Sequence, residues 1–218
     1  MPRLVFAHGW GLDRTLWDAV LAELGDLAAG AIVLDSGYYG RPAGAGALNG
    51  ARVLGVGQSM GALELLACPP GRLCGLVAID AFARFAAAPD FPAGQDERKL
   101  RLMARRLDQG PRALVAEFLE RSLRGVAPPI GEPDRDALAR GLDRLLDLDG
   151  RAAVKDLPIW RLHAAQDPIA PLALADASFA PAQERARQVR EGGDHLSPLT
   201  APETCAALIR TAVQALRL

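Results

Sequence analysis

The sequence predicts an α/β protein with a doubly wound, mostly parallel sheet of about six strands and one inserted helical segment. Three observations support this prediction. Short apolar runs bounded by Gly, Pro or Asp show no two-residue alternation, which is typical of parallel strands buried on both faces. Segments with helical spacing separate these runs, as in proteins with alternating strands and helices. Between residues 81 and 150 the alternation stops and only helical patterns remain.

The core elements follow in order along the chain. Strands are expected at 4–7, 31–34, 52–56, 75–79, 157–162 and 186–189, and helices at 13–24, 59–67 and 202–216. In the first helix, Leu16, Val20 and Leu24 share one face at helical spacing. For 218 residues, one domain with a small insertion is the usual organisation. We therefore expect a core formed by residues 1–80 and 151–218.

The insertion, residues 81–150, is predicted to hold three helices, at 96–109, 111–123 and 134–148. The second begins with Pro111, a residue favoured at the first position of a helix. Pro128 and Pro129 separate it from the third. A helical segment inserted between two strands is expected to form a lid over the carboxyl edge of the sheet.

Composition excludes several classes of protein. The chain has 25 basic and 26 acidic residues, a net charge of −1, which argues against a nucleic-acid partner. It has no run of 18 apolar residues and no signal-peptide core, so we expect no membrane segment. The cysteines, Cys68, Cys74 and Cys205, are odd in number and lack metal-ligand spacing. We expect reduced thiols in a cytoplasmic, monomeric protein without metal or cofactor.

The strongest functional motif is Gly57-Gln58-Ser59-Met60-Gly61, which follows one expected strand and opens a helix. A G-x-S-x-G sequence in this context is the nucleophile elbow, a tight turn that exposes a serine at the end of a strand. Ser59 is therefore the candidate nucleophile. The alternative is a glycine-rich turn that serves only packing.

A serine becomes a useful nucleophile when a base accepts its proton, and the chain has three histidines. His195 lies in a loop beyond the last expected strand, from which it can reach a serine on a middle strand. His163 ends the strand at 157–162 and is interpreted as structural. His8 precedes Gly9 and is interpreted as shaping the first loop. His195 is thus the candidate base.

Two aspartates compete to orient that base. Asp167 lies between the serine and the histidine in chain order, and Ser–Asp–His is the order that this type of site uses. Asp80, at the end of the strand at 75–79, could instead bind a backbone N–H or cap the entry to the insertion. Asp194 adjoins His195 and would point the wrong way. Asp167 is the preferred candidate.

An oxyanion needs two hydrogen-bond donors. One is expected to be the backbone N–H of Met60, directly after the nucleophile. The other is expected to be the N–H of Trp10, in the glycine-flanked first loop. The candidate substrate-binding residues are aromatic: Trp10, Tyr38, Phe82, Phe85 and Phe118.

These motifs together resemble the α/β-hydrolases over essentially the whole chain. The opening His8-Gly9-Trp10-Gly11-Leu12 with Trp17, and the stretch 157–167, are similar to the pimeloyl-acyl-carrier-protein methyl ester carboxylesterases of biotin synthesis. The resemblance implies an α/β-hydrolase fold, a triad of Ser59, Asp167 and His195, an oxyanion donor after His-Gly, and a basic helical lid that docks an acidic carrier protein. Gln58 stands where that family often has His or Trp.

The charge of the insertion bears on a carrier partner. Residues 81–125 hold nine basic and six acidic groups. On a helix, Arg98, Arg101 and Arg105 would share one face, which could attract an acyl carrier protein. The alternative is a solvated helix face.

The expected activity is therefore that of a serine carboxylesterase, with the pimeloyl-carrier methyl ester as the implied substrate. Two alternatives stay open at this point. One is a short-chain carboxylesterase or thioesterase of broad specificity. The other is a catalytically silent binding protein with a hydrolase fold.

Overall fold

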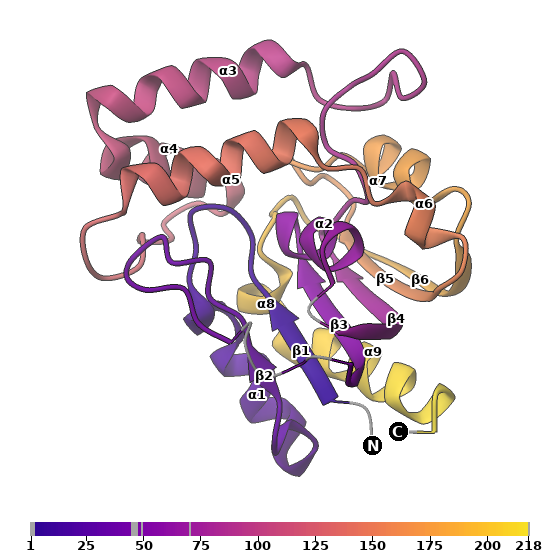
Figure 1. The fold of residues 1–218 in the computed structure, drawn as a ribbon. Helices are drawn as coiled ribbons and strands as arrows, with labels where there is room; N and C mark the ends of the chain where they lie inside the picture. The colour runs from indigo at the N-terminus through magenta and orange to yellow at the C-terminus, as the bar shows by residue number, and fades with distance from the viewer. Residues whose placement is uncertain (1–2, 45–47, 49, 70, 218) are drawn as a thin grey trace.

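The computed structural model describes residues 3–44, 48, 50–69 and 71–217. Six strands form one sheet in the order β2-β1-β3-β4-β5-β6, and every neighbouring pair is parallel (Figure 1). The strands are β1 (Arg3–Ala7), β2 (Ile32–Val33), β3 (Arg52–Gln58), β4 (Arg72–Ile79), β5 (Pro158–Ala164) and β6 (Gln183–Arg190). The predicted parallel sheet of six strands is confirmed.

The strand order reverses beside β1. The chain passes from β1 to β2 on one side and then returns to β3 on the other side. In open α/β sheets, ligands bind at such a switch point, beyond the carboxyl ends of the strands. The loop after β1, with His8 to Gly11, and the turn after β3, with Ser59, both begin there.

Helices cover both faces of the sheet. On one face, α2 (Met60–Ala67) packs on the central strands and on α6 (Arg151–Val154), which contacts α7 (Leu172–Phe179). On the other face, α9 (Pro202–Ala215) packs on β4, β5, α1 (Asp18–Leu24) and α8 (Ser197–Thr200). Short 3₁₀ segments, Arg14–Trp17 and Gly25–Ala28, flank α1. The sequence did not predict α6, α7 or α8, which are too short to show a clear helical period.

Residues 81–150 contain α3 (Glu97–Arg106), α4 (Pro111–Ser122) and α5 (Arg135–Asp147), and no strand of the sheet. The 3₁₀ turn Leu107–Gln109 connects α3 to α4. Asp96 caps α3 by accepting from Arg98 N, and Asp134 caps α5 by accepting from Ala137 N. The three helices lie together beyond the carboxyl ends of the strands (Figure 1). We call residues 81–150 the helical insertion.

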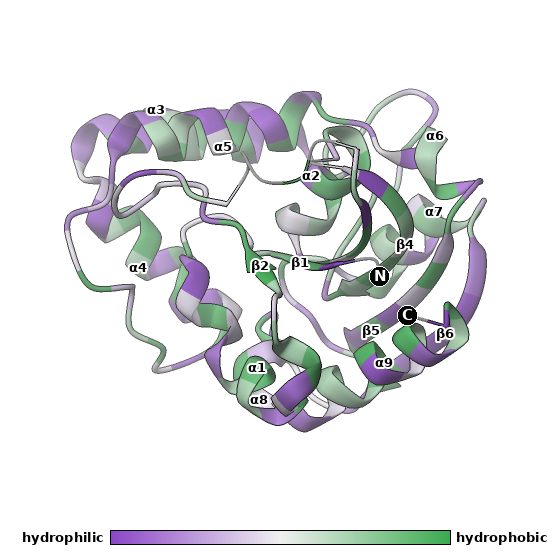
Figure 2. Ribbon diagram, turned by 60° about the horizontal axis from the view of Figure 1, so that its bottom comes forward, coloured by the Kyte–Doolittle hydropathy of each residue, from purple (hydrophilic) through white to green (hydrophobic). Residues whose placement is uncertain are grey.

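The apolar side chains explain why these layers pack. Along β1, Val5 faces the α2 layer, whereas Phe6 faces the α1 and α9 layer. The apolar cluster that contains Phe6 continues into the insertion, where Leu100, Leu138 and Leu142 are buried. The outward-facing residues of the insertion are mostly polar, with Leu102 and Ile130 as exposed apolar exceptions. Helices α3 and α5 carry hydrophilic and hydrophobic residues together (Figure 2). The insertion is thus an amphipathic layer fixed to the core by its apolar side.

Across the described ranges, no helix is long and apolar enough to cross a membrane.

Candidate active site

The turn between β3 and α2 has the backbone of a nucleophile elbow. Ser59 has φ 53° and ψ −124°, a strained conformation for a residue with a side chain. A Cβ built on Gly61 would lie 2.2 Å from the carbonyl oxygen of Ala7, and one on Gly57 would lie 2.4 Å from Ala62 N. Strand, turn and helix therefore approach each other too closely for any side chain at these two positions.

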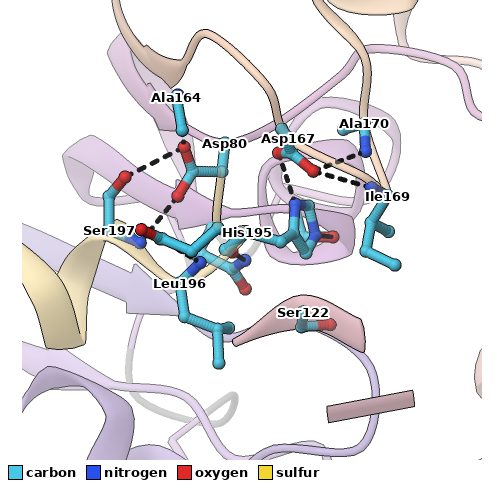
Figure 3. A network of polar contacts seen from close by, with 12 residues as sticks. Asp80, Ser122, Ala164, Asp167, Ile169, Ala170, His195, Leu196 and Ser197 are labelled. Carbon is cyan, nitrogen blue, oxygen red and sulfur yellow. Dashed lines mark hydrogen bonds and ion pairs between the residues drawn. The ribbon is translucent and has the colours of Figure 1, made fainter. Parts of the chain in front are cut away.

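Three side chains form a hydrogen-bonded chain at this turn. Ser59 Oγ lies 2.8 Å from His195 Nε2, and His195 Nδ1 lies 2.6 Å from Asp167 Oδ2. The other oxygen, Asp167 Oδ1, accepts from the N–H groups of Ile169 and Ala170, at 2.8 and 2.9 Å (Figure 3). With Asp167 ionised, His195 carries its proton on Nδ1, and Nε2 is left to accept the serine proton.

The charge of Asp167 makes His195 a stronger base. Burial of the ring disfavours its charged form, but the negative charge of Asp167, the hydrogen bond to it and the charges of Asp80 and Asp194 together more than offset this effect. The pKa of His195 is therefore raised above its ordinary value. Asp194 adds negative charge nearby, yet its carboxylate binds Arg190 and Leu196 N rather than the ring.

The carboxylate oxygens of Asp80 accept hydrogen bonds from partners other than the histidine ring. Its Oδ1 accepts from Ala164 N at 3.2 Å and from the hydroxyl of Ser197 at 3.0 Å, and its Oδ2 accepts from Ser197 N at 2.8 Å (Figure 3). Burial raises the pKa of Asp80 to about 6. Asp80 therefore joins the end of β5 to the start of α8, which follows the His195 loop.

Replacing Asp80 with alanine is expected to lower the free energy of unfolding by about 2–4 kcal/mol, because buried donors of Ala164 and Ser197 would lose their acceptor. Urea unfolding at pH 7 measures this loss. Asp143→Ala, at an exposed site on α5, is the matched control and should change stability by less than about 0.5 kcal/mol. Equal stability of the two variants would contradict the structural role of Asp80.

The two expected oxyanion donors, the N–H groups of Met60 and Trp10, belong to segments that lie beside Ser59. Met60 is the first residue of α2, so its N–H has no acceptor within the helix. The first loop lies directly against Ser59, since a Cβ on Gly9 would lie 3.1 Å from Ser59 Cβ. The next residue, Trp10, anchors this loop to the insertion by donating from Nε1 to Leu138 O at 2.9 Å.

Among the described residues, the other two histidines, His8 and His163, make no hydrogen bond to Ser59 Oγ. His8 Nε2 accepts from Ser36 N at 3.1 Å, and its Nδ1 is 2.9 Å from Gly9 O, so the ring connects the loops after β1 and β2. His163 is fully buried on β5, and burial lowers its pKa to about 3. His163 therefore stays neutral at physiological pH.

A cavity of about 270 Å³ opens beside Ser59. Four of the five expected substrate-binding aromatics line it: Trp10, Phe82, Phe85 and Phe118. Tyr38 lies elsewhere, in the wall of a separate cavity of about 570 Å³ that contains neither Ser59 nor His195. The placement of Tyr38 differs from the expectation because the chain after β2 turns under α5, where Tyr38 O accepts from Asp134 N.

The main chain of His195 is held from two sides, which the sequence did not reveal. Gln58 Nε2 donates to His195 O at 2.7 Å, and His195 N donates to Ser122 O at 2.7 Å. Gln58 precedes Ser59, and Ser122 ends α4 in the insertion. These contacts join residues more than 70 positions apart, so no local pattern could have indicated them.

The three arginines expected to dock a carrier, Arg98, Arg101 and Arg105, are exposed on α3. Arg101 is paired with Glu97 at 3.0 Å, and Arg105 Nε donates to Arg101 O. Within the described part of the chain, no cluster of three or more His, Cys, Asp or Glu side chains could hold a metal ion.

The chain resembles known proteins over most of its length. Residues 4–208 match the model of the alpha/beta hydrolase family. The chain is 29% identical over 202 residues to a biotin biosynthesis bifunctional protein, BioHC, of Cellvibrio japonicus; the match covers 81% of this chain and 40% of that protein. It is 29% identical over 198 residues to a pimeloyl-[acyl-carrier protein] methyl ester esterase of Klebsiella pneumoniae, covering 77% and 76%.

Solved structures show the same fold at low sequence identity. An esterase from Exiguobacterium antarcticum superposes with a TM-score of 0.76 at 19% identity, covering 98% of this chain and 92% of that one. A thermophilic esterase from Thermogutta terrifontis gives 0.73 at 21% identity, covering 100% and 91%.

Proposed function

This chain belongs to the alpha/beta hydrolase family, and from that premise we propose that it is a serine carboxylesterase with the triad Ser59, His195 and Asp167. The hydrogen-bonded chain from Ser59 through His195 to Asp167, at the wall of a mostly apolar cavity, is the observation that supports this proposal. The esterase names of the relatives support the same class of reaction.

In the proposed mechanism, Ser59 Oγ attacks the ester carbonyl while His195 Nε2 accepts its proton. The N–H groups of Met60 and Trp10 bind the oxygen that becomes negative. His195 then gives its proton to the departing alcohol. A water molecule, deprotonated by the same histidine, then attacks the acyl carbonyl. The bond to Ser59 Oγ breaks, the acid leaves, and His195 returns the proton to Ser59 Oγ. Asp167 keeps the ring in the required tautomer and stabilises its charged form throughout.

We further propose an acyl-carrier-linked substrate, the pimeloyl-carrier methyl ester, as in the relatives' names. The exposed face of α3 supports this proposal, because Arg98, Arg101 and Arg105 lie on it and a carrier protein of this class is acidic. A short-chain esterase acting on free esters is the second candidate, favoured by the small size of the cavity, about 270 Å³. Cytoplasmic location and a monomeric state stay predictions.

Reversing two of these charges separates the two candidates. Arg101→Glu with Arg105→Glu is expected to raise KM for the carrier-linked ester about tenfold, because attraction to the acidic partner becomes repulsion. KM for a small p-nitrophenyl ester should be unchanged. Steady-state kinetics on both substrates measures the difference.

The matched control is Arg52→Glu with Arg72→Glu, since these arginines are exposed at the opposite, amino edge of the sheet. The control should leave both KM values unchanged. Equal KM changes for the two substrates in the α3 variant would reject carrier docking at α3.

A further inference from the structure

The wall of the cavity beside Ser59 contains two cations. Its lining is otherwise largely apolar, with Trp10, Leu100 and Phe118 among its members. Lys99 reaches it from α3 and Arg121 from α4, so two separate helices place positive charge at one cavity. An ester carbonyl and a hydrocarbon chain do not need such charges.

Among the described residues neither cation forms an ion pair with a carboxylate, although Arg121 helps to lower the pKa of Glu117, which pairs with Arg106. Lys99 Nζ donates to the neutral amide oxygen of Gln95 at 3.3 Å, and Gln95 Nε2 donates to Ile169 O at 3.3 Å. These two hydrogen bonds link the ammonium group of Lys99, through Gln95, to Ile169 in the segment that follows Asp167. No aspartate or glutamate belongs to the described lining of the cavity.

Arg121 differs from the other arginines of the insertion. Six of those pair with carboxylates: Arg84, Arg101, Arg106, Arg112, Arg135 and Arg144. Within the described ranges, Arg98, Arg105, Arg121, Arg124 and Arg140 have no such pair, and of these only Arg121 lines the cavity beside Ser59. Arg121 and Lys99 are both exposed, so the two cations border the cavity and also face solvent.

We propose that Lys99 and Arg121 bind an anionic group, a carboxylate or a phosphate, on the substrate at a distance from its ester. The inference rests on the proposed function only in taking Ser59 as the reacting residue. It names a substrate class: a carboxylic ester whose apolar chain fills the cavity and whose anion lies between α3 and α4. This site is separate from Arg98, Arg101 and Arg105, which lie outside the cavity lining.

Two sources could supply the anion, and paired substrates distinguish them. A monomethyl ester of a straight-chain dicarboxylic acid carries a free carboxylate, whereas the dimethyl ester of the same acid is neutral. A methyl ester acid linked to pantetheine 4′-phosphate carries a phosphate, whereas the pantetheine thioester lacks it. Each pair changes the charge and keeps the reacting methyl ester.

The test compares the wild type with the variant Lys99→Met/Arg121→Met, which keeps apolar side chains of similar length. The wild type should prefer the anionic member of at least one pair. In the variant, kcat/KM for that member should fall about tenfold or more, because charge-assisted hydrogen bonds are lost, while the neutral member changes less than about twofold. Arg124→Met, an unpaired arginine outside the cavity, is the control and should alter neither.

A binding measurement makes the result independent of turnover. Monomethyl dicarboxylate and the phosphopantetheine thioester are titrated by calorimetry into the Ser59→Ala protein, with and without the Lys99→Met/Arg121→Met change. A Kd about tenfold weaker in the changed protein supports the site for that anion. An unchanged Kd for both anions overturns it, even if esters are hydrolysed. Anion binding without hydrolysis by the wild type would instead reject the esterase proposal and keep the anion site.

Discussion

Replacing Ser59 with alanine is expected to reduce kcat/KM for a short p-nitrophenyl ester by about 10⁶-fold, the scale seen when a triad serine is removed. The physical reason is direct: Ser59 Oγ is the only hydroxyl within hydrogen-bond distance of His195 Nε2 among the described residues. Without it, no acyl-enzyme forms. Only weak catalysis by the oxyanion donors and substrate binding would remain.

The fold should tolerate this change, since among the described residues the hydroxyl makes no hydrogen bond except with His195. The thermal midpoint of Ser59→Ala is expected to match that of the wild type. Ser36→Ala is the control. Ser36 does not line the cavity that contains Ser59, so this variant should keep full activity. Turnover by Ser59→Ala above a tenth of wild type would contradict the assignment of the nucleophile.

Asp167→Asn is expected to lower kcat by about 10⁴-fold, through the wrong histidine tautomer. The carboxylate accepts from Ile169 N and Ala170 N on one oxygen and from His195 on the other. An asparagine must turn its carbonyl oxygen toward the two backbone donors, so its NH₂ faces His195 Nδ1. The imidazole would then carry its proton on Nε2 and could not accept one from Ser59.

The pH profile gives an independent reading of the same contact. The base acts in its neutral form, so kcat/KM of the wild type should rise with pH through the pKa of His195, which lies above the ordinary 6.5. Removing the negative charge of Asp167 lowers that pKa. The acid limb of the residual activity in Asp167→Asn should therefore move to lower pH.

Asp194→Asn is the matched control, because Asp194 adjoins His195 but binds Arg190 and Leu196 N. It should keep activity within about tenfold of the wild type and retain a stable fold. If Asp167→Asn were nearly fully active while Asp80→Asn lost activity, Asp80 would be the orienting acid and the assignment would be wrong.

Local patterns in the sequence were sufficient for much of the fold. The four central strands, β1, β3, β4 and β5, appear as apolar runs because they are buried on both faces, whereas the edge strand β6 is largely exposed and polar. The helices α3, α4 and α5 appear because each buries one side. The turn around Ser59 is recognised from a motif of five residues, and Gly57 is required by Ala62, which is five positions away. Gly61, in contrast, is required by the carbonyl oxygen of Ala7 on β1, a contact that is distant in sequence.

The choice between Asp80 and Asp167 depends on contacts that are distant in sequence. Both follow adjacent strands, β4 and β5, and both are buried near the same histidine. Only the fold shows that Ser197 and Ala164 occupy the oxygens of Asp80. The same limit explains Tyr38, an aromatic residue whose cavity is decided by how the chain after β2 passes under α5.

In the insertion, too, some features can be predicted from the sequence and others require the structure. The excess of basic over acidic residues in its first part, residues 81–125, is visible in the sequence, but which arginines lack an ion pair is not. Arg106 and Glu117 pair across two helices, as do Arg144 and Glu64. Such pairs form only after the helices pack. The sequence therefore indicated the arginine face of α3, whereas the placement of Lys99 and Arg121 at the cavity required the structure.

The most direct test of the central claim is covalent labelling by a fluorophosphonate, a reagent that reacts with a serine activated by a neighbouring base. The intact protein should take up one equivalent, and mass spectrometry of the digest should place it on Ser59. Ser59→Ala should take up none, and Asp167→Asn should react far more slowly. A folded wild-type protein that stays unlabelled, or is labelled at another residue, would contradict the account.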